Sequence, residues 1–172
     1  MIPHPDITAH FFDDNGPFPN NRRLPLLVMK NAVALSGSDP AACFEILFKR
    51  HRWENGWRNG IFAYHHFHST AHEVLGIYAG GAEVQFGGPE GPTLAVSAGD
   101  AVVIPAGVAH KRQSASSDFR VVGSYPRGQS PDMNIGRPEE RPGVYRNIDR
   151  TSIPDQDPIF GIDGPLIMHW TS

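Results

Sequence analysis

The chain has 172 residues, of which 40% are hydrophobic and 19% charged, and its net charge at pH 7 is -3. This length predicts one domain and this composition a folded globular protein, while the absence of a basic patch argues against a nucleic-acid partner. The longest apolar runs are far shorter than the roughly 20 residues that a membrane-spanning helix needs. No nucleic acid and no membrane are therefore expected as partners.

The single cysteine and the start of the chain bear on where the protein works. Cys43 has no second cysteine to pair with, so an internal disulfide is excluded. The first residues, M-I-P-H-P-D-I-T, carry neither the basic nor the apolar region of a secretory signal. Both observations favour a reducing, cytoplasmic location.

The first third of the sequence predicts an arm, a strand and a helix. Residues 1–25 are rich in Pro, Asn and Asp and predict an irregular N-terminal arm. The run L-P-L-L-V-M-K at 24–30 predicts a strand at a sheet edge, because Pro25 cannot donate to a ladder. Asp39 stands at a helix N-cap position and predicts a helix over 40–52.

The sequence that follows predicts a series of short strands, because Gly and Pro interrupt it at short intervals. Many short strands are typical of a sandwich, a barrel or a jelly roll. The last part of the chain is rich in Pro, Arg, Asp and Gly but ends in the apolar run G-P-L-I-M-H-W, so an extended tail is expected to dock on the barrel. The expected strands are 61–68, 73–79, 82–86, 93–97, 101–105, 109–114 and 119–125. The expected single domain, 1–172, divides into an arm (1–25), a helix and barrel core (26–126) and a tail (127–172).

A histidine cluster stands out in the stretch H-H-F-H-S-T-A-H-E-V-L-G, residues 65–76. In a strand, His66 and His68 would share one face at about 6.5 to 7 Å and could converge on one ion. The same alternation makes His72 and Glu73 face opposite ways, so only one of them can join that ion. We expect it to be Glu73 and place His72 at the surface or beside the ligands. An H-x-H pair alone is equally compatible with two ordinary histidines on a polar face.

The spacing around this cluster adds a resemblance to a known family. The pattern G-(x)5-H-x-H-(x)4-E-(x)6-G spans residues 60–80, and G-(x)5-P-x-G-(x)2-H spans residues 99–110. Both patterns resemble the two motifs of the cupin superfamily. The runs W-R-N-G at 57–60, A-G-D-A-V-V-I-P-A-G-V-A-H-K-R at 98–112 and S-D-F-R-V-V-G-S-Y-P at 117–126 are more closely similar to small single-domain bacterial cupins of the YjlB-like type.

This resemblance implies an all-β fold, a double-stranded β-helix (the jelly-roll or cupin barrel) with one helix before the barrel motifs. It also implies one divalent transition metal inside the barrel, with the ligands His66, His68, Glu73 and His110. Three imidazoles and a carboxylate suit Fe, Mn, Ni or Co in an octahedron with open positions, whereas Zn with four protein ligands would favour a closed tetrahedron.

Strand alternation from these ligands predicts the rest of the pocket. The expected lining is Phe62, Tyr64, Leu75, Ile77, Arg112 and Ser114. Of these, Tyr64 and Arg112 are expected to orient a substrate. Ser114 stands where the second cupin motif usually has Asn, so any contact made by that amide is in doubt. His65 is expected to pack beside Phe67 rather than to bind metal.

Two functions follow, with a third ranked last. The first is a metal-dependent enzyme, of the dioxygenase or isomerase type, acting on a small organic molecule. The alternative is a non-catalytic cupin that binds a small-molecule ligand, and the last is a metal-free structural homologue. A homodimer is also expected, because the apolar first strand and the C-terminal segment would otherwise lie at an exposed sheet edge.

Overall fold

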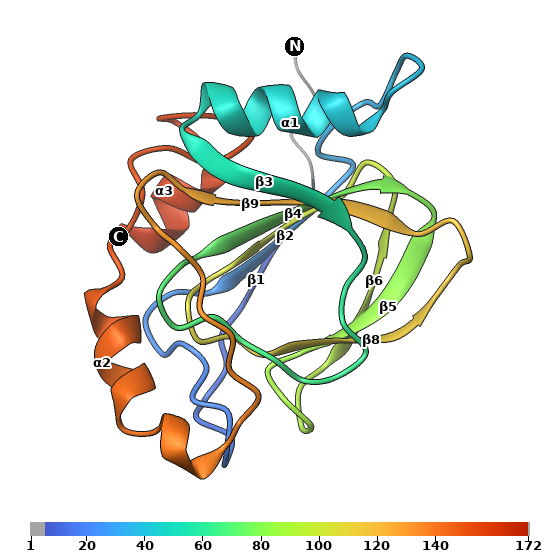
Figure 1. Cartoon of the computed structure of the whole chain (residues 1–172). Helices are drawn as coiled ribbons and strands as arrows, with labels where there is room; N and C mark the ends of the chain where they lie inside the picture. The colour runs from blue at the N-terminus through green and yellow to red at the C-terminus, as the bar shows by residue number, and fades with distance from the viewer. Residues whose placement is uncertain (1–5, 172) are drawn as a thin grey trace.

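The computed structural model describes residues 6–171 and folds as two facing antiparallel sheets (Figure 1). One sheet has six strands in the order β1-β2-β7-β4-β9-β3, and the other has three in the order β6-β5-β8. The strands are β1 (Asp6–His10), β2 (Leu26–Lys30), β3 (Trp53–Asn59), β4 (Glu73–Ala79), β5 (Gly81–Phe86), β6 (Thr93–Ser97), β7 (Ala101–Ile104), β8 (His110–Ala115) and β9 (Arg120–Pro126). This is the expected all-β double-stranded β-helix of the cupin fold.

Most of the predicted strands are confirmed within a residue or two, but the one at 61–68 is wrong. That stretch forms no regular strand and makes only two isolated β-bridges, from His66 to His110 and from Phe67 to Asn134. The strand in this part of the chain is β3, which pairs with β9 across a register shift between Glu54 and Trp57. Asn55 sits in this irregularity with a φ of 57°, so turn-forming residues lie inside the strand and conceal it from a reading of the sequence.

The N-terminal predictions need two corrections. Part of the arm is a strand, because β1 pairs with β2 along its whole length, and β2 is therefore not an edge strand. Pro25 precedes β2, so its missing N–H removes no ladder hydrogen bond. Asp39 does not cap the helix α1 (Ala41–Arg50), whose N-cap is Pro40; its carboxylate accepts two hydrogen bonds from Arg58 instead, at 2.9 and 3.0 Å.

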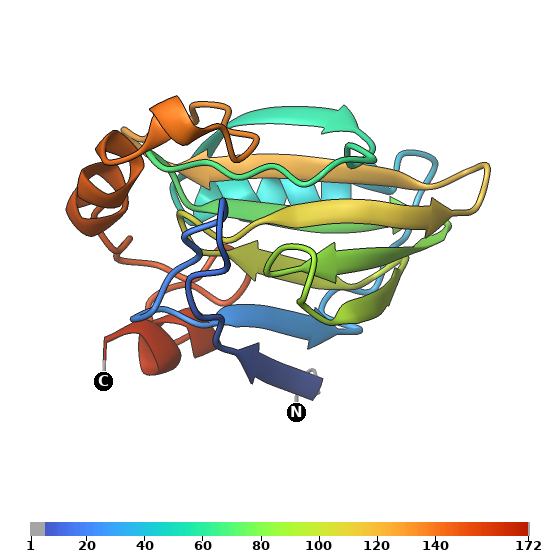
Figure 2. The same cartoon turned by 90° about the horizontal axis from the view of Figure 1, so that it is seen from below.

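The C-terminal tail is partly helical rather than only extended. It contains the short 3-10 helix η1 (Pro138–Glu140) and the helices α2 (Gly143–Arg150) and α3 (Pro165–Trp170). The one helix expected before the barrel motifs is α1. Both views place α2 and α3 on one side of the molecule, away from β5 and β6 (Figure 1, Figure 2). No helix within residues 6–171 is long and apolar enough to cross a membrane.

Strand alternation divides the apolar side chains into two cores. One core fills the space between the two sheets, and the other packs between the back of the six-stranded sheet, α1 and α3. Leu75 and Ile77 of β4 face the first core, and Val74 faces the second. Figure 1 shows α1 along the back of this sheet, on the side away from β5, β6 and β8.

Gly76 allows α1 to lie this close to the sheet. A Cβ atom at this position would lie 2.5 Å from the ring of Phe44, a fully buried residue of α1. Any larger residue at 76 would therefore push the helix away from β4. The back of the sheet is filled, and the space left for a site is in the barrel interior.

Candidate metal centre

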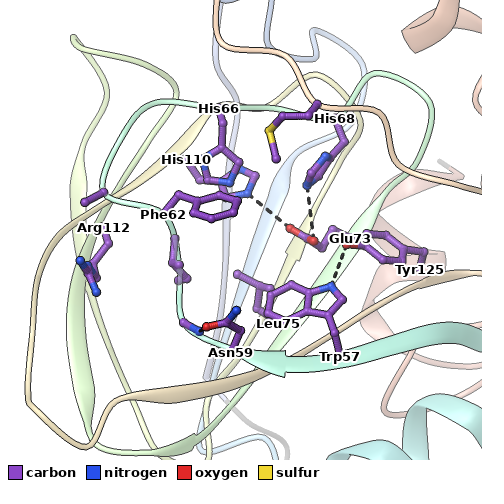
Figure 3. A pocket seen from close by; sticks show the side chains of 14 residues that line it. Trp57, Asn59, Phe62, His66, His68, Glu73, Leu75, His110, Arg112 and Tyr125 are labelled. Atoms are coloured by element: carbon purple, nitrogen blue, oxygen red, sulfur yellow. Dashed lines mark hydrogen bonds and ion pairs between the residues drawn. The ribbon is translucent and has the colours of Figure 1, made fainter.

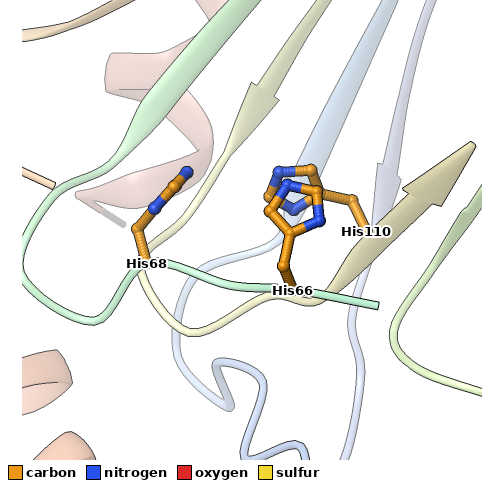
Figure 4. A group of neighbouring side chains, drawn as sticks. All are labelled: His66, His68 and His110. Carbon is orange, nitrogen blue, oxygen red and sulfur yellow. The ribbon is translucent and has the colours of Figure 1, made fainter. Parts of the chain in front are cut away.

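Three buried imidazoles converge inside the barrel. The ligand-type atoms of His66, His68 and His110 all lie within 4.8 Å of one another (Figure 4). The Glu73 carboxylate lies beside them, with Oε1 3.3 Å from Nε2 of His110 and Oε2 3.5 Å from Nε2 of His68. The structure thus brings together all four side chains that the sequence predicts as ligands.

These four side chains come from three separate parts of the chain. His110 opens β8, and Glu73 opens β4 on the face that points inward. His66 is held next to His110 by two backbone hydrogen bonds, of 2.9 and 3.2 Å, so the extended segment 66–68 acts as a short extra strand here. This pairing brings the H-x-H sequence to the metal centre although no regular strand carries it.

The hydrogen bonds of the three rings fix where their protons lie. Nδ1 of each ring faces a backbone carbonyl: Tyr64 for His66 (2.9 Å), Asp132 for His68 (2.6 Å) and Val108 for His110 (3.1 Å). A carbonyl oxygen can only accept, so each Nδ1 carries a proton, and Nε2 is the nitrogen left with a lone pair in a neutral ring. Metal-binding histidines in proteins are usually oriented in this way. The donor set therefore fits a divalent transition metal.

The charges inside the centre agree with a cation site. Burial and the neighbouring His110 lower the pKa of His66 to about 3. Burial also opposes the charge on His68, but the Glu73 carboxylate outweighs it and raises the pKa of His68 to about 9. Although burial acts in the other direction, His68 and His110 hold the pKa of Glu73 well below its usual range. The Glu73 carboxylate thus favours a positive charge beside it, at Nε2 of His68.

A cavity of about 470 Å³ opens from the metal centre (Figure 3). Most of its wall is apolar, and its polar side chains beyond the four predicted ligands are few, which is typical of a site for a small organic molecule. The apolar lining includes Trp57, Ile61, Phe62, Leu75 and Met133, and the polar lining includes Asn59, Arg112 and Tyr125.

Two lining residues were missed as site residues by the sequence reasoning. Nε1–H of Trp57 donates to the Tyr125 hydroxyl over 2.8 Å. Burial and the charge of Glu73 raise the pKa of Tyr125 above its usual value. Gly123 makes this arrangement possible, because a Cβ atom there would lie 2.2 Å from the Trp57 indole. The alternation along β9 offered a signal for Tyr125, but nothing in the sequence pointed to Trp57.

Several residues of the predicted lining lie elsewhere. Phe62, Leu75 and Arg112 line the cavity as expected. Tyr64 is 46% exposed and stacks on Phe62 at 5.0 Å between ring centroids, outside the lining. Ile77 belongs to the core between the sheets, and Ser114 is exposed on β8.

Irregular backbone explains why Tyr64 and Ser114 do not line the cavity. Segment 61–68 is not a strand, so alternation cannot be extended from His66 to Tyr64. On β8, a register shift between Glu83 and Val84 of the partner strand β5 interrupts the pairing before Ser114. Period-two counting is valid only within an uninterrupted ladder.

The remaining histidines of the cluster point away from the centre. His72 faces the opposite side from Glu73, as predicted, but it lies neither at the surface nor beside the ligands. It is fully buried behind the sheet, where its ring packs on Trp170 at 4.8 Å. His65 packs on the ring of Phe18 at 5.4 Å between centroids, and Phe18 in turn contacts Phe67 edge-on.

Comparison with known proteins gives one sequence relative and several distant structures. The uncharacterised protein YjlB of Bacillus subtilis (strain 168) is 44% identical over 165 residues, which cover 96% of this chain and 97% of the relative. No protein-family model matches the sequence. Solved structures with a similar chain path include the epimerase RmlC of Legionella pneumophila (14% identity, 71% of this chain and 72% of that one, TM-score 0.39). A variant of the Bacillus subtilis oxalate decarboxylase OxdC is similar over 69% of this chain and 29% of its own (15% identity, TM-score 0.39).

Proposed function

Because the chain belongs to the YjlB family and folds as a cupin double-stranded β-helix, we propose that it is a metal-dependent enzyme acting on a small organic molecule. The observation that carries this proposal is the convergence of three Nδ1-anchored imidazoles and the Glu73 carboxylate at the end of a mostly apolar cavity. The reaction would be of the dioxygenase or isomerase type, at a reducing, cytoplasmic location.

His66, His68, Glu73 and His110 would hold one divalent metal, of which Fe, Mn, Ni, Co and Zn are the candidates. The metal would supply Lewis-acid polarisation of a substrate oxygen, or electron transfer with O2. The chain itself contributes a mostly apolar cavity, in which a hydrogen bond joins Trp57 to Tyr125. This hydrogen bond would fix the part of the cavity wall that these two side chains form beside Glu73.

Arg112 would bind an acidic group of the substrate. Its side chain is the only Lys or Arg among those lining the cavity, and its guanidinium has no ion-pair or hydrogen-bond partner within residues 6–171. A divalent metal with one carboxylate ligand leaves a net positive charge, and Arg112 adds to it. A small organic acid with an apolar body therefore matches the cavity, since a guanidinium binds carboxylates in a bidentate manner. Tyr64, at the rim, would orient the outer part of the substrate through its stacked neighbour Phe62.

Metal loading and turnover test the proposal together. The protein is purified from cells grown with each candidate metal, its metal content is measured, and O2 uptake and isomerisation are followed with small phenols, thiols and keto acids. We expect about one metal per chain and turnover of at least one acidic compound. A protein that contains no metal after growth with any of the candidate metals would refute the metal centre. Full loading with no turnover would instead favour the alternative, a cupin that binds and retains a small molecule.

A pair of arginine substitutions tests the acidic substrate. Arg112→Gln should raise the KM for an acidic substrate by about 10- to 100-fold, the usual range for loss of a hydrogen bond to a charged group. The amide analogue of the same substrate should be unaffected. Arg120→Gln is the matched control, because Arg120 is an exposed arginine on β9, the next strand along the chain, and does not line the cavity. Equal effects of the two substitutions would contradict a role for Arg112.

A homodimer remains a prediction. The edge of the six-stranded sheet on this side is β1 and not the apolar strand β2. Most residues of β1, D-I-T-A-H, are exposed. An edge of unpaired backbone groups still offers a surface for a second copy. Light scattering that reports a mass of 18.9 kDa at micromolar concentration would contradict it.

A further inference from the structure

The turn after the H-x-H pair is bound by a distant part of the chain. Asp132 lies in the C-terminal segment, and its main-chain carbonyl accepts the hydrogen bond from Nδ1 of His68. Its carboxylate accepts from the backbone N–H groups of Ser69 (2.6 Å) and Thr70 (3.3 Å) and from the Ser69 hydroxyl. One residue thus holds both a predicted ligand and the turn that carries it.

Further hydrogen bonds join the two segments around Asp132. The Thr70 hydroxyl donates to the carbonyl of Ser130 (2.6 Å) and accepts from the N–H of Asp132 (3.0 Å). On the other side, Phe67 and Asn134 exchange two backbone hydrogen bonds of 3.0 Å. Residues 130–134, which we call the clamp segment, therefore lie against residues 67–70 over their whole length.

The helix α2 supports the same turn from behind. The side-chain amide of Asn147 donates to the Ser69 hydroxyl (3.0 Å), and the Thr151 hydroxyl donates to the Ser69 carbonyl (3.0 Å). Ser69 is fully buried as a result. The turn is fixed by partners that follow it by 60 residues or more in the sequence.

His68 differs in this respect from the other two imidazoles. The Nδ1 groups of His66 and His110 each donate to a carbonyl two residues earlier in the chain, so their orientation is set locally. The acceptor of His68 is 64 residues away. Only His68 therefore depends on the docking of the C-terminal segment for its proton position and ring orientation.

We propose that Asp132 is a positioning residue of the metal centre, and that the clamp segment completes the centre by orienting His68. The proposal rests on the proposed function, since it assumes that His68 binds a metal. Loss of the Asp132 carboxylate frees the turn at Ser69 and Thr70, moves the carbonyl away from Nδ1 and lets the His68 ring rotate. Partners of this kind behind metal-binding histidines typically change metal affinity by about 10- to 100-fold.

Three variants of the full chain test this proposal. Asp132→Ala removes the acceptors for Ser69 and Thr70, and Asp132→Asn restores one acceptor oxygen. The matched control is Asp157→Asn, because Asp157 is a second carboxylate of the C-terminal tail that accepts backbone N–H groups, and it is fully buried. It accepts backbone N–H groups of Ile159, Phe160 and Leu166 at 2.8 to 3.0 Å, outside the metal centre.

Metal affinity is measured by competition with a chromophoric chelator, and the coordination by the visible spectrum of the Co(II) form. We expect Asp132→Ala to weaken binding by about 10- to 100-fold and to alter the spectrum, with Asp132→Asn between Asp132→Ala and the unaltered chain. Asp157→Asn should lower the melting temperature and change neither readout. A normal affinity and spectrum in Asp132→Ala, or an equal loss of affinity in Asp157→Asn, would overturn the proposal.

A second measurement needs no metal and separates this proposal from the proposed function. In nitrogen-labelled, metal-free protein, the Nδ1–H of His68 should exchange slowly with water, because it is buried and donates to Asp132. Asp132→Ala should make that exchange fast while the Nδ1–H of His110 stays slow. If the chain binds no metal, the proposed function fails, but this contrast still decides whether Asp132 orients His68. Equal exchange in both proteins would refute it.

Discussion

His110 and His72 are both fully buried, yet they differ in what their nitrogens can do. His110 donates from Nδ1 to a carbonyl and directs Nε2 towards Glu73. His72 instead accepts at Nδ1 from the N–H of Ala106 over 2.8 Å, so its proton must lie on Nε2 and neither nitrogen is free to bind a metal. The partner of Nδ1, rather than burial, separates a histidine that could bind a metal from a structural one.

The two faces of the six-stranded sheet differ in a similar way, since one could bind a ligand and the other is structural. The inner face keeps a cavity of about 470 Å³ beside Glu73, whereas the outer face is packed by α1 and α3. Neighbouring residues in the sequence, His72 and Glu73, belong to different faces. Changes to the predicted metal ligands on the inner face should therefore alter ligand binding with little effect on stability, and changes to the core on the outer face should do the reverse.

The largest expected effect is the loss of metal binding in His110→Ala. Partners behind metal-binding histidines account for about 10- to 100-fold in affinity, so removal of a ligand itself should exceed about 100-fold. Metal content after dialysis and competition with a chelator measure this loss. His72→Gln is the matched control and should bind metal normally. A comparable loss of metal affinity in both variants would contradict the proposed difference between the two faces.

Phe44→Ala should give the largest effect on the outer face. The ring of Phe44 is fully buried against β4, and such a truncation typically lowers the free energy of unfolding by about 3 to 5 kcal/mol. Urea denaturation measures it, with Ile46→Ala, an exposed position of the same helix, as the control. Metal affinity of the folded Phe44→Ala protein should be unchanged. A parallel loss of affinity would show that the two faces are coupled.

Acid should destabilise the outer face through His72. Burial lowers the pKa of His72 to about 4 from an ordinary value of 6.5. Above pH 6.5 both the folded and the unfolded chain hold it neutral. Between pH 6.5 and 4 only the unfolded chain takes up the proton, so stability falls as the pH falls, by about 3 kcal/mol in all.

The test is urea denaturation across pH 4 to 8 in excess chelator, comparing the unaltered chain with His72→Gln. The substitution keeps an acceptor for the Ala106 N–H but removes the titration. We expect the free energies of unfolding of the two proteins to converge as the pH falls, since only the unaltered chain carries the His72 penalty. Parallel pH profiles would show that His72 is not held neutral by burial.

The smallest effect concerns the hydrogen bond between Trp57 and Tyr125 in the cavity wall. A double-mutant cycle with Trp57→Phe and Tyr125→Phe should give a coupling free energy of about 1 kcal/mol, since both variants keep an aromatic ring. Metal affinity should change little in either variant, because neither residue is a predicted ligand. A coupling near zero would mean that the two side chains act independently.

The fold could be foreseen because Gly and Pro mark the strand ends, and the four predicted ligands because their spacing resembles the two cupin motifs. Predictions failed where the backbone departs from a regular ladder. The strand β3 contains turn residues at a bulge, and Tyr64 lies in a segment that belongs to no regular ladder.

The residues predicted a series of short strands and a histidine cluster, and their resemblance to the two cupin motifs implied that three imidazoles and a carboxylate would meet inside a barrel. The folded chain adds which nitrogen of each ring faces the interior, which side chains line the cavity and what holds His68. The rings of His66 and His110 are oriented by carbonyls two residues earlier. The ring of His68 depends on Asp132, 64 residues away, and no local pattern encodes such a distance. Long-range docking of the C-terminal segment thus completes a centre that short-range periodicity begins.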